Sequence, residues 1–294
     1  MKKKLINLIA AATLLAGTGT ACVPMQHVPV NNYNHPQYSE QKVTLDDLIS
    51  SSYCLLSQRE YQDSAGNTFN AGGYGSSFAY REVDGFSYLI TNQHVVGELE
   101  QNLNGTIYNR DKVDIKIIDS KFDNNKDDDI PLEIVFESEE LDLAILRTDQ
   151  KLNFLPEKNL NLNSDLEFGE EIYLIGYPLA MFPSVTEGIV ANPGLYPFHY
   201  EFEDKVNGLT VPNSARKVLD LSANPGNSGG PLFVKKDGQL YWAGIISAYL
   251  IHNAGGPFYQ ENSGLAIAMD SKIIKEIADY VIMNVDECVK ECKM

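Results

Sequence analysis

Cysteine and histidine are scarce in this chain, with four and five copies among 294 residues. The cysteine spacings match no zinc site. An acidic run at 123–129 resembles the start of a calcium-binding loop, but Asp128 and Ile134 stand where such a loop needs glycine and glutamate. We therefore predict neither a metal nor a cofactor, and we interpret 123–129 as a solvated loop.

Basic residues are outnumbered, since 23 lysines and arginines face 40 aspartates and glutamates. The formal charge of −17 argues against a nucleic-acid partner, because phosphate backbones are bound through basic side chains. Such an acidic surface instead favours a soluble protein outside the cytoplasm.

The N-terminal hydrophobic run is too short to span a membrane. This run, 5–16, follows three lysines and leads to small residues before Cys22, which is typical of a secretory signal peptide at 1–21. Alanine followed by Cys22 suggests lipoprotein processing, with Cys22 as the lipidated N-terminus that holds the protein at a membrane. We expect an exported, lipid-anchored protein of the bacterial cell envelope. Ordinary signal cleavage, which gives a periplasmic or secreted soluble protein, is the alternative.

Residues 22–42 are rich in proline, asparagine, glutamine and tyrosine, and little in them can pack. We predict a flexible tether in which His27 and His35 are solvated. The remaining residues, 43–294, fit one domain of the size that all-β folds reach.

Lipidation of Cys22 would leave three cysteines, and export permits disulfides. Cys54, near the start of the domain, is then a candidate to pair with Cys288 or Cys292 near the C-terminus. A Cys22–Cys54 disulfide would instead argue against lipidation, so the sequence leaves both pairings open.

Short apolar or alternating runs recur with turn signals between them, which is typical of an all-β pair of barrels. We place the first barrel at about 53–150 and the second at about 165–270. Residues from about 271 to 290 have helical periodicity and predict a C-terminal helix that packs on the second barrel.

The segment 224–231 places Ser228 among three glycines. Glycine tolerates backbone angles that other residues avoid, so this loop can hold a hydroxyl outward and aim backbone N–H groups at one point. An oxyanion hole beside a nucleophile requires that arrangement. By itself the segment is equally consistent with a tight turn that happens to carry a serine.

A nucleophilic serine needs a base, and the base needs a group that orients it. His94 follows the strand-like run 86–91, from which it can face a cleft. Asp142 opens an apolar strand, where a carboxylate is costly to bury unless it is hydrogen-bonded, and a histidine N–H would supply that bond. A structural histidine and a strand-entry cap are the plainer interpretations of these two residues.

The order of the three residues along the chain separates two hydrolase classes. Gly-x-Ser-x-Gly also fits the nucleophile elbow of α/β-hydrolases, in which the acid and the histidine follow the serine. After Ser228 the only histidine is His252, and too little chain remains for the crossovers of that fold. The order His94, Asp142, Ser228 is that of the chymotrypsin type.

On these residues the chain resembles a trypsin-like serine peptidase of the chymotrypsin fold, closest to the HtrA/Deg branch. The resemblance implies two six-stranded antiparallel β-barrels, and we expect no PDZ domain because few residues follow 270. The insertions 101–131 and 192–217 depart from the family pattern. The matching segments occur in family order: 75–78, 91–96, 141–146, 175–178, 185–190, 224–231, 244–247 and 264–268.

The resemblance implies roles for four residues. His94 is then the general base, Asp142 orients it, and Ser228 is the nucleophile. The backbone N–H groups of Gly226 and Ser228 form the oxyanion hole.

It also implies the character of the specificity pocket and of activation. Ser222, six residues before the nucleophile, lies at the base of the primary pocket, and Ser247 lies nearby. An uncharged pocket favours small or medium apolar side chains. Asn227 stands where the digestive branch has an aspartate that pairs with a newly cut N-terminus, so we do not expect activation by cutting.

These features predict a serine endopeptidase that hydrolyses peptide bonds of extracytoplasmic proteins, with protein or peptide substrates as its partners. The alternative is a catalytically inactive lipoprotein that keeps the peptidase fold as a binding or structural surface. An esterase would differ only in the leaving group. The sequence gives no indication of the oligomeric state.

Overall fold

The structure is a computed structural model, and it describes six stretches of the chain: 42–119, 129–194, 205–206, 209–210, 216–253 and 260–285. The predicted signal peptide, the tether up to residue 41, and the cysteines at 22, 288 and 292 lie outside the described residues. The acidic run up to residue 128 also lies outside them. Within the described stretches, no helix has the length and apolar character needed to cross a membrane.

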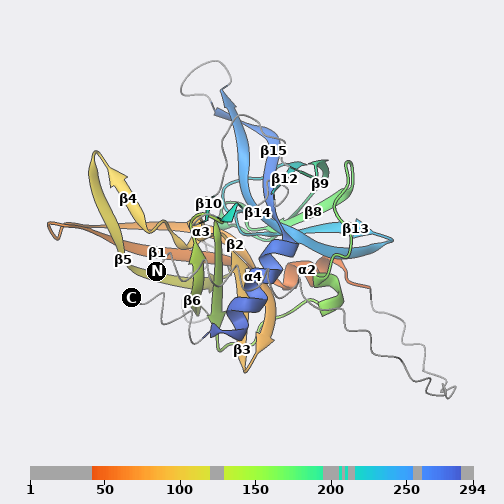
Figure 1. Cartoon of the computed structure of the whole chain (residues 1–294), viewed down its shortest axis with the longest axis horizontal. Helices are drawn as coiled ribbons and strands as arrows, with labels where there is room; N and C mark the ends of the chain where they lie inside the picture. Colours follow the sequence, from red (N-terminus) through yellow and green to blue (C-terminus); the bar gives the residue numbers. More distant parts are fainter. Residues whose placement is uncertain are drawn as a thin grey trace.

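Six antiparallel strands of the N-terminal half close into a barrel because β1 pairs with β2 on one side and with β5 on the other. A seventh strand, β4, extends β5 as a projecting hairpin (Figure 1). The strands are β1 (Ser52–Asp63), β2 (Thr68–Val83), β3 (Phe86–Thr91), β4 (Glu100–Leu103), β5 (Thr106–Ile118), β6 (Ile130–Ser138) and β7 (Leu143–Thr148).

Six strands of the C-terminal half form a second closed barrel, in the order β12-β15-β14-β13-β8-β9. A separate two-stranded ladder, β10 and β11, falls within the predicted insertion 192–217. The strands are β8 (Glu171–Gly176), β9 (Ser184–Asn192), β10 (Lys205–Val206), β11 (Leu209–Thr210), β12 (Arg216–Asp220), β13 (Pro231–Lys236), β14 (Gln239–Asn253) and β15 (Gln260–Asp270).

Helices are few, as the strand-rich sequence predicts. The last one, α4, spans Ser271–Met283; Asp270 caps its N-terminus, and its buried residues lie on one face. The prediction of two six-stranded antiparallel barrels followed by a C-terminal helix is therefore confirmed. The remaining helices are α2 (Leu45–Ser50), α3 (Gln93–Val96), and the 3-10 helices η2 (Glu157–Leu160) and η3 (Pro178–Ala180).

The two barrels share one apolar core besides the core inside each barrel. Trp242 of β14 is fully buried, and its ring lies 4.9 Å from Phe78 and 5.8 Å from Tyr80, both on β2. Ile274 of α4 belongs to the same cluster, and the Tyr80 hydroxyl donates to Asp279 of α4 at 2.6 Å. Burial of large aromatic rings is strongly favourable, so α4 and β2 fix the barrels against each other.

A smaller contact between the barrels contains Cys54. This residue is buried, has no disulfide partner among the described residues, and packs with Ile118 of the first barrel and with Tyr177 and Ala180 of the second. Burial raises the pKa of the Cys54 thiol to about 12, because an apolar surrounding disfavours the thiolate. Its predicted disulfide partners lie outside the described residues.

We therefore predict that Cys54 resists alkylation in the folded protein. Iodoacetamide at about pH 8.5 should leave Cys54 unmodified in the native state and modify it after unfolding, because the thiolate is the nucleophile. Peptide mapping by mass spectrometry reads this out, and fast native alkylation of Cys54 would contradict the prediction.

The same group makes stability depend on pH. The unfolded thiol loses its proton near pH 8.5, whereas the folded thiol keeps it to about 12. Between these values the unfolded state binds fewer protons, so this contribution to the free energy of unfolding is complete below pH 8.5 and declines as pH rises. The difference in unfolding midpoint between wild type and Cys54→Ala should shrink over that range.

Candidate active site

The glycines of the segment 224–231 are required by the turn that carries Ser228. Gly226 and Gly229 have φ angles of +97° and +79°, in the region that favours glycine. A β-carbon on Gly229 would lie 2.2 Å from the Ser76 carbonyl oxygen, and one on Gly226 would lie 2.5 Å from the Tyr177 carbonyl oxygen. The turn is therefore pressed against both barrels, and Ser228 itself is partly exposed.

Ser76 of β2 anchors this turn from the opposite barrel. Its N–H donates to the Ser228 carbonyl oxygen at 2.8 Å, and its hydroxyl donates to the Gly226 carbonyl oxygen at 2.7 Å. The same hydroxyl accepts a hydrogen bond from the Tyr177 N–H at 2.9 Å. Through the two hydrogen bonds to the turn, fully buried Ser76 holds the backbone of the turn in one conformation.

Two backbone donors of the turn are left for a ligand. Among the described residues, neither the Gly226 N–H nor the Ser228 N–H has a hydrogen-bond acceptor. The intervening N–H of Asn227 donates to the Asn224 carbonyl oxygen at 3.0 Å, and the Asn227 side chain is buried. The two unused N–H groups are those that the resemblance assigns to an oxyanion hole.

His94 and Asp142 are brought together from separate elements of the first barrel. The His94 Nδ1 atom lies 2.8 Å and 3.0 Å from the two carboxylate oxygens of Asp142, and the His94 N–H donates to Oδ1 at 3.1 Å. The imidazole side chain remains 41% exposed, whereas that of Asp142 is 21% exposed. The ring is thus held through Nδ1, while much of the side chain remains accessible to solvent.

The second barrel completes the surroundings of Asp142 through Ser247. The Ser247 hydroxyl donates to Asp142 Oδ2 at 2.5 Å. A register shift in the β14–β15 ladder between Ile246 and Ala248 leaves Ser247 without a strand partner, and such bulges redirect a side chain. This hydroxyl, which the sequence placed near the specificity pocket, is bound to the predicted acid. Ser222, the other predicted pocket residue, is exposed just beyond β12.

Asn92 is a site residue to which sequence reasoning gave no role. It occupies the N-cap position of α3 but makes no capping hydrogen bond with its side chain. Its fully buried amide instead donates to the carbonyl oxygen of Asp142 at 2.9 Å. Asp142 has a φ of +52°, a left-handed conformation that costs a non-glycine residue about 1–3 kcal/mol. The Asn92 amide therefore stabilises the strained backbone that aims the carboxylate.

The Ser228 turn meets the His94 segment at the junction of the barrels. A β-carbon on Gly229 would lie 2.2 Å from Thr91 Oγ1 and 3.1 Å from the Asn92 nitrogen, so the turn and the segment before His94 are in contact. Within the described stretches, the His94 and Ser228 side chains make no direct hydrogen bond. All three predicted residues thus lie at one junction, with His94 and Asp142 already paired.

No group of three or more histidine, cysteine, aspartate or glutamate side chains able to hold a metal ion occurs in the described part of the chain.

The chain is similar in sequence to proteins whose names describe serine proteases. The "Probable periplasmic serine endoprotease DegP-like" of Hahella chejuensis is 27% identical over 195 residues, which cover 65% of this chain and 33% of that protein. The "Serine protease Do-like HtrA" of Bacillus subtilis is 27% identical over 246 residues, 82% of this chain and 46% of its own length. The chain thus spans about a quarter to a half of the length of the curated relatives it matches.

A solved structure, "HtrA-type protease AlgW with decapeptide", aligns with a TM-score of 0.53 at 21% identity over 82% of this chain and 68% of that one. This likeness confirms the predicted chymotrypsin-like fold class. The sequence model of the trypsin-like peptidase domain matches residues 75–241, which include His94, Asp142 and Ser228. The chain therefore belongs to the trypsin-like peptidase domain family.

Proposed function

We propose that the protein is a serine endopeptidase that hydrolyses peptide bonds through an acyl-enzyme. The observation that carries this proposal is the His94–Asp142 pair, at 2.8 Å, beside a turn whose Gly226 and Ser228 N–H groups have no acceptor among the described residues. Family membership and relatives whose names describe serine proteases support the same reaction class.

In this reaction Ser228 Oγ attacks the peptide carbonyl while His94 Nε2 accepts the hydroxyl proton. Asp142 holds the Nδ1–H of the ring and stabilises the imidazolium that forms. The developing oxyanion accepts hydrogen bonds from the Gly226 and Ser228 N–H groups, which are already oriented by the turn. His94 then protonates the leaving amine, and water repeats the sequence on the acyl-enzyme. Hydrogen bonds between base and nucleophile are often long in free enzymes and shorten when substrate binds.

A fluorophosphonate probe tests this assignment directly. Wild type should be labelled at Ser228, Ser228→Ala should not be labelled, and Ser64→Ala, which removes an exposed serine on the β1–β2 turn, should be labelled normally. Cleavage of casein by wild type would then distinguish a peptidase from an esterase. A folded wild-type protein that stays unlabelled would instead support the inactive binding or structural role.

Asn92 is predicted to act as a positioning residue for Asp142. Asn92→Ala should lower kcat by about 10–100-fold with little change in KM, because losing a buried hydrogen bond costs about 1–3 kcal/mol and the amide does not touch substrate. Asn92→Asp keeps the shape but removes the donor, so it should be as impaired. Rates are normalised to the concentration of labelled sites, which separates misplacement of Asp142 from unfolding. An Asn92→Asp variant with wild-type kcat would overturn the role.

We further propose that the protein is exported and anchored through a lipidated Cys22. The lysine-rich start, the short apolar run and Ala21-Cys22 support this, as does the word periplasmic in the name of the Hahella chejuensis relative. Mass spectrometry of the mature protein should find a cleaved, acylated Cys22. An unmodified mature N-terminus would exclude the anchor and leave a periplasmic or secreted soluble protein.

A further inference from the structure

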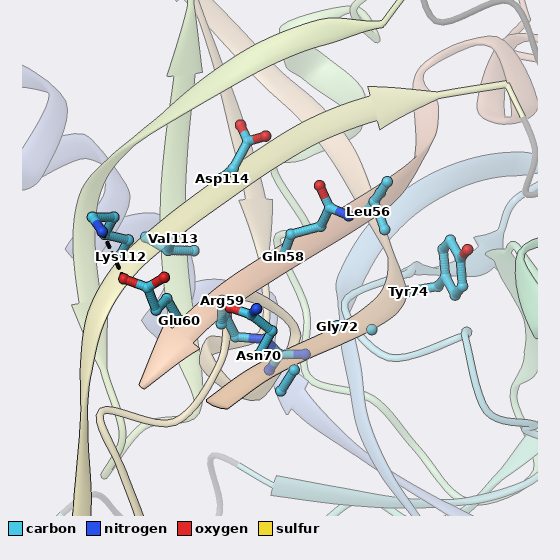
Figure 2. Close-up of a pocket in the computed structure, with 12 residues that line it drawn as sticks. Leu56, Gln58, Arg59, Glu60, Asn70, Gly72, Tyr74, Lys112, Val113 and Asp114 are labelled. Atoms are coloured by element: carbon cyan, nitrogen blue, oxygen red, sulfur yellow. Dashed lines mark hydrogen bonds and ion pairs between the residues drawn. The ribbon is translucent and has the colours of Figure 1, made fainter. Parts of the chain in front are cut away.

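A groove of about 790 Å³ lies over β1, β2 and β5 of the first barrel (Figure 2). Asn70, Gly72 and Tyr74 follow one another along the β2 side of it, and Gln58 and Arg59 belong to the neighbouring strand β1 (Figure 2). Tyr74 is 43% exposed, so the groove offers an aromatic surface as well as polar groups.

Strand β2 leads from the groove to the candidate active site. Two residues beyond Tyr74 on this strand, Ser76 donates to the carbonyl oxygen of Ser228 at 2.8 Å. By the resemblance, the pocket for the residue before the scissile bond belongs to the second barrel, around Ser222. A substrate that crosses the junction therefore reaches the groove on the first barrel with the residues that follow the scissile bond.

Arg59 is the one unpaired charge among the described side chains that line the groove. Lys112 is paired with Glu60 at 2.6 Å, and Asp114 is paired with Lys116 at 3.3 Å. In the described part of the chain Arg59 has no hydrogen bond or ion pair, and its buried Nε atom has no acceptor. Burying a donor without a partner costs about 1–3 kcal/mol, so the guanidinium is incompletely hydrogen-bonded in the folded protein.

Two glycines make room for this side chain. A β-carbon on Gly97 would lie 2.1 Å from the Arg59 Cδ atom, and one on Gly73 would lie 2.8 Å from a guanidinium nitrogen. The arginine is therefore held between the end of α3 and the β2 strand, with little freedom to fold away. A guanidinium held in place binds a carboxylate through two parallel hydrogen bonds.

We propose that Arg59 binds a substrate carboxylate on the leaving-group side of the scissile bond and so makes the enzyme prefer acidic substrates there. This inference rests on the proposed peptidase function. Gly73, beside the guanidinium, precedes Ser76 by three residues, or about 10 Å of strand. An extended peptide covers that distance in about three residues, so the carboxylate belongs to the third residue after the scissile bond or its neighbours.

Peptide binding to the Ser228→Ala variant tests this without requiring turnover. Fluorescence anisotropy would compare peptides that carry glutamate or glutamine at the second, third or fourth position after the scissile bond. Further peptides end at one of these positions in a free carboxylate or an amide. They show whether the site binds a side-chain carboxylate or the C-terminus of a peptide. The carboxylate peptide should bind about tenfold tighter than its amide counterpart, since a hydrogen bond to a charged group contributes about 1.5–3 kcal/mol.

Variants of Arg59 then assign the preference. In the Ser228→Ala background, Arg59→Gln should abolish the preference and leave binding of the glutamine peptide within about twofold. Arg59→Lys should keep the charge but only part of the preference, because an ammonium group cannot donate the two parallel hydrogen bonds of a guanidinium. Lys151→Gln, which removes an exposed cation outside the groove, should keep all of it. Unfolding midpoints check that each variant is folded.

The outcomes for the two proposals differ. Equal binding of glutamate and glutamine peptides, or a preference that survives Arg59→Gln, would overturn the role of Arg59 whether or not the wild type turns over substrate. The wild-type protein could instead show an Arg59-dependent preference and yet not react with a fluorophosphonate. That result would support the carboxylate-binding site and overturn the proposed peptidase function.

Discussion

The hydrogen bonds of Ser76 are the constraint on which the rest of the site depends. Its N–H and hydroxyl bind the Ser228 and Gly226 carbonyl oxygens, and the hydroxyl also accepts from the Tyr177 N–H. One small residue of the first barrel thereby fixes the turn of the second barrel that carries Ser228. The shared aromatic core around Trp242 supplies the rigidity behind it, because β2 carries both Ser76 and the rings that pack on Trp242.

The site also shows how backbone strain is held at a functional position. Asp142 keeps a left-handed φ because Asn92 binds its carbonyl oxygen from one side while His94 and Ser247 bind its carboxylate from the other. No single one of these contacts fixes the position of the Asp142 carboxylate. Together they hold both its backbone conformation and its orientation. The network draws its residues from three separate segments, namely α3 with its N-cap, the turn before β7, and β14.

The sequence was sufficient for the architecture and for the residues with a strong local pattern. Alternating runs predicted the barrels, and the strand before His94 and the glycines around Ser228 marked those two residues. It was insufficient where the role depends on a contact across the fold. Asn92 looked like an ordinary residue at a helix start, and the direction of Ser247 depends on a bulge that no short pattern marks. The position of the Arg59 side chain depends on the space left by Gly73 and Gly97, which are both distant in sequence.

Ser247 joins the two halves of the chain in a further respect. The proposed acid and base, Asp142 and His94, come from the first barrel, whereas Ser228, the proposed oxyanion donors and the hydroxyl on Asp142 come from the second. A chain that has folded only one barrel therefore holds no complete set of reactive groups. If the protein is the exported peptidase proposed above, it would become active only when the two barrels dock after export.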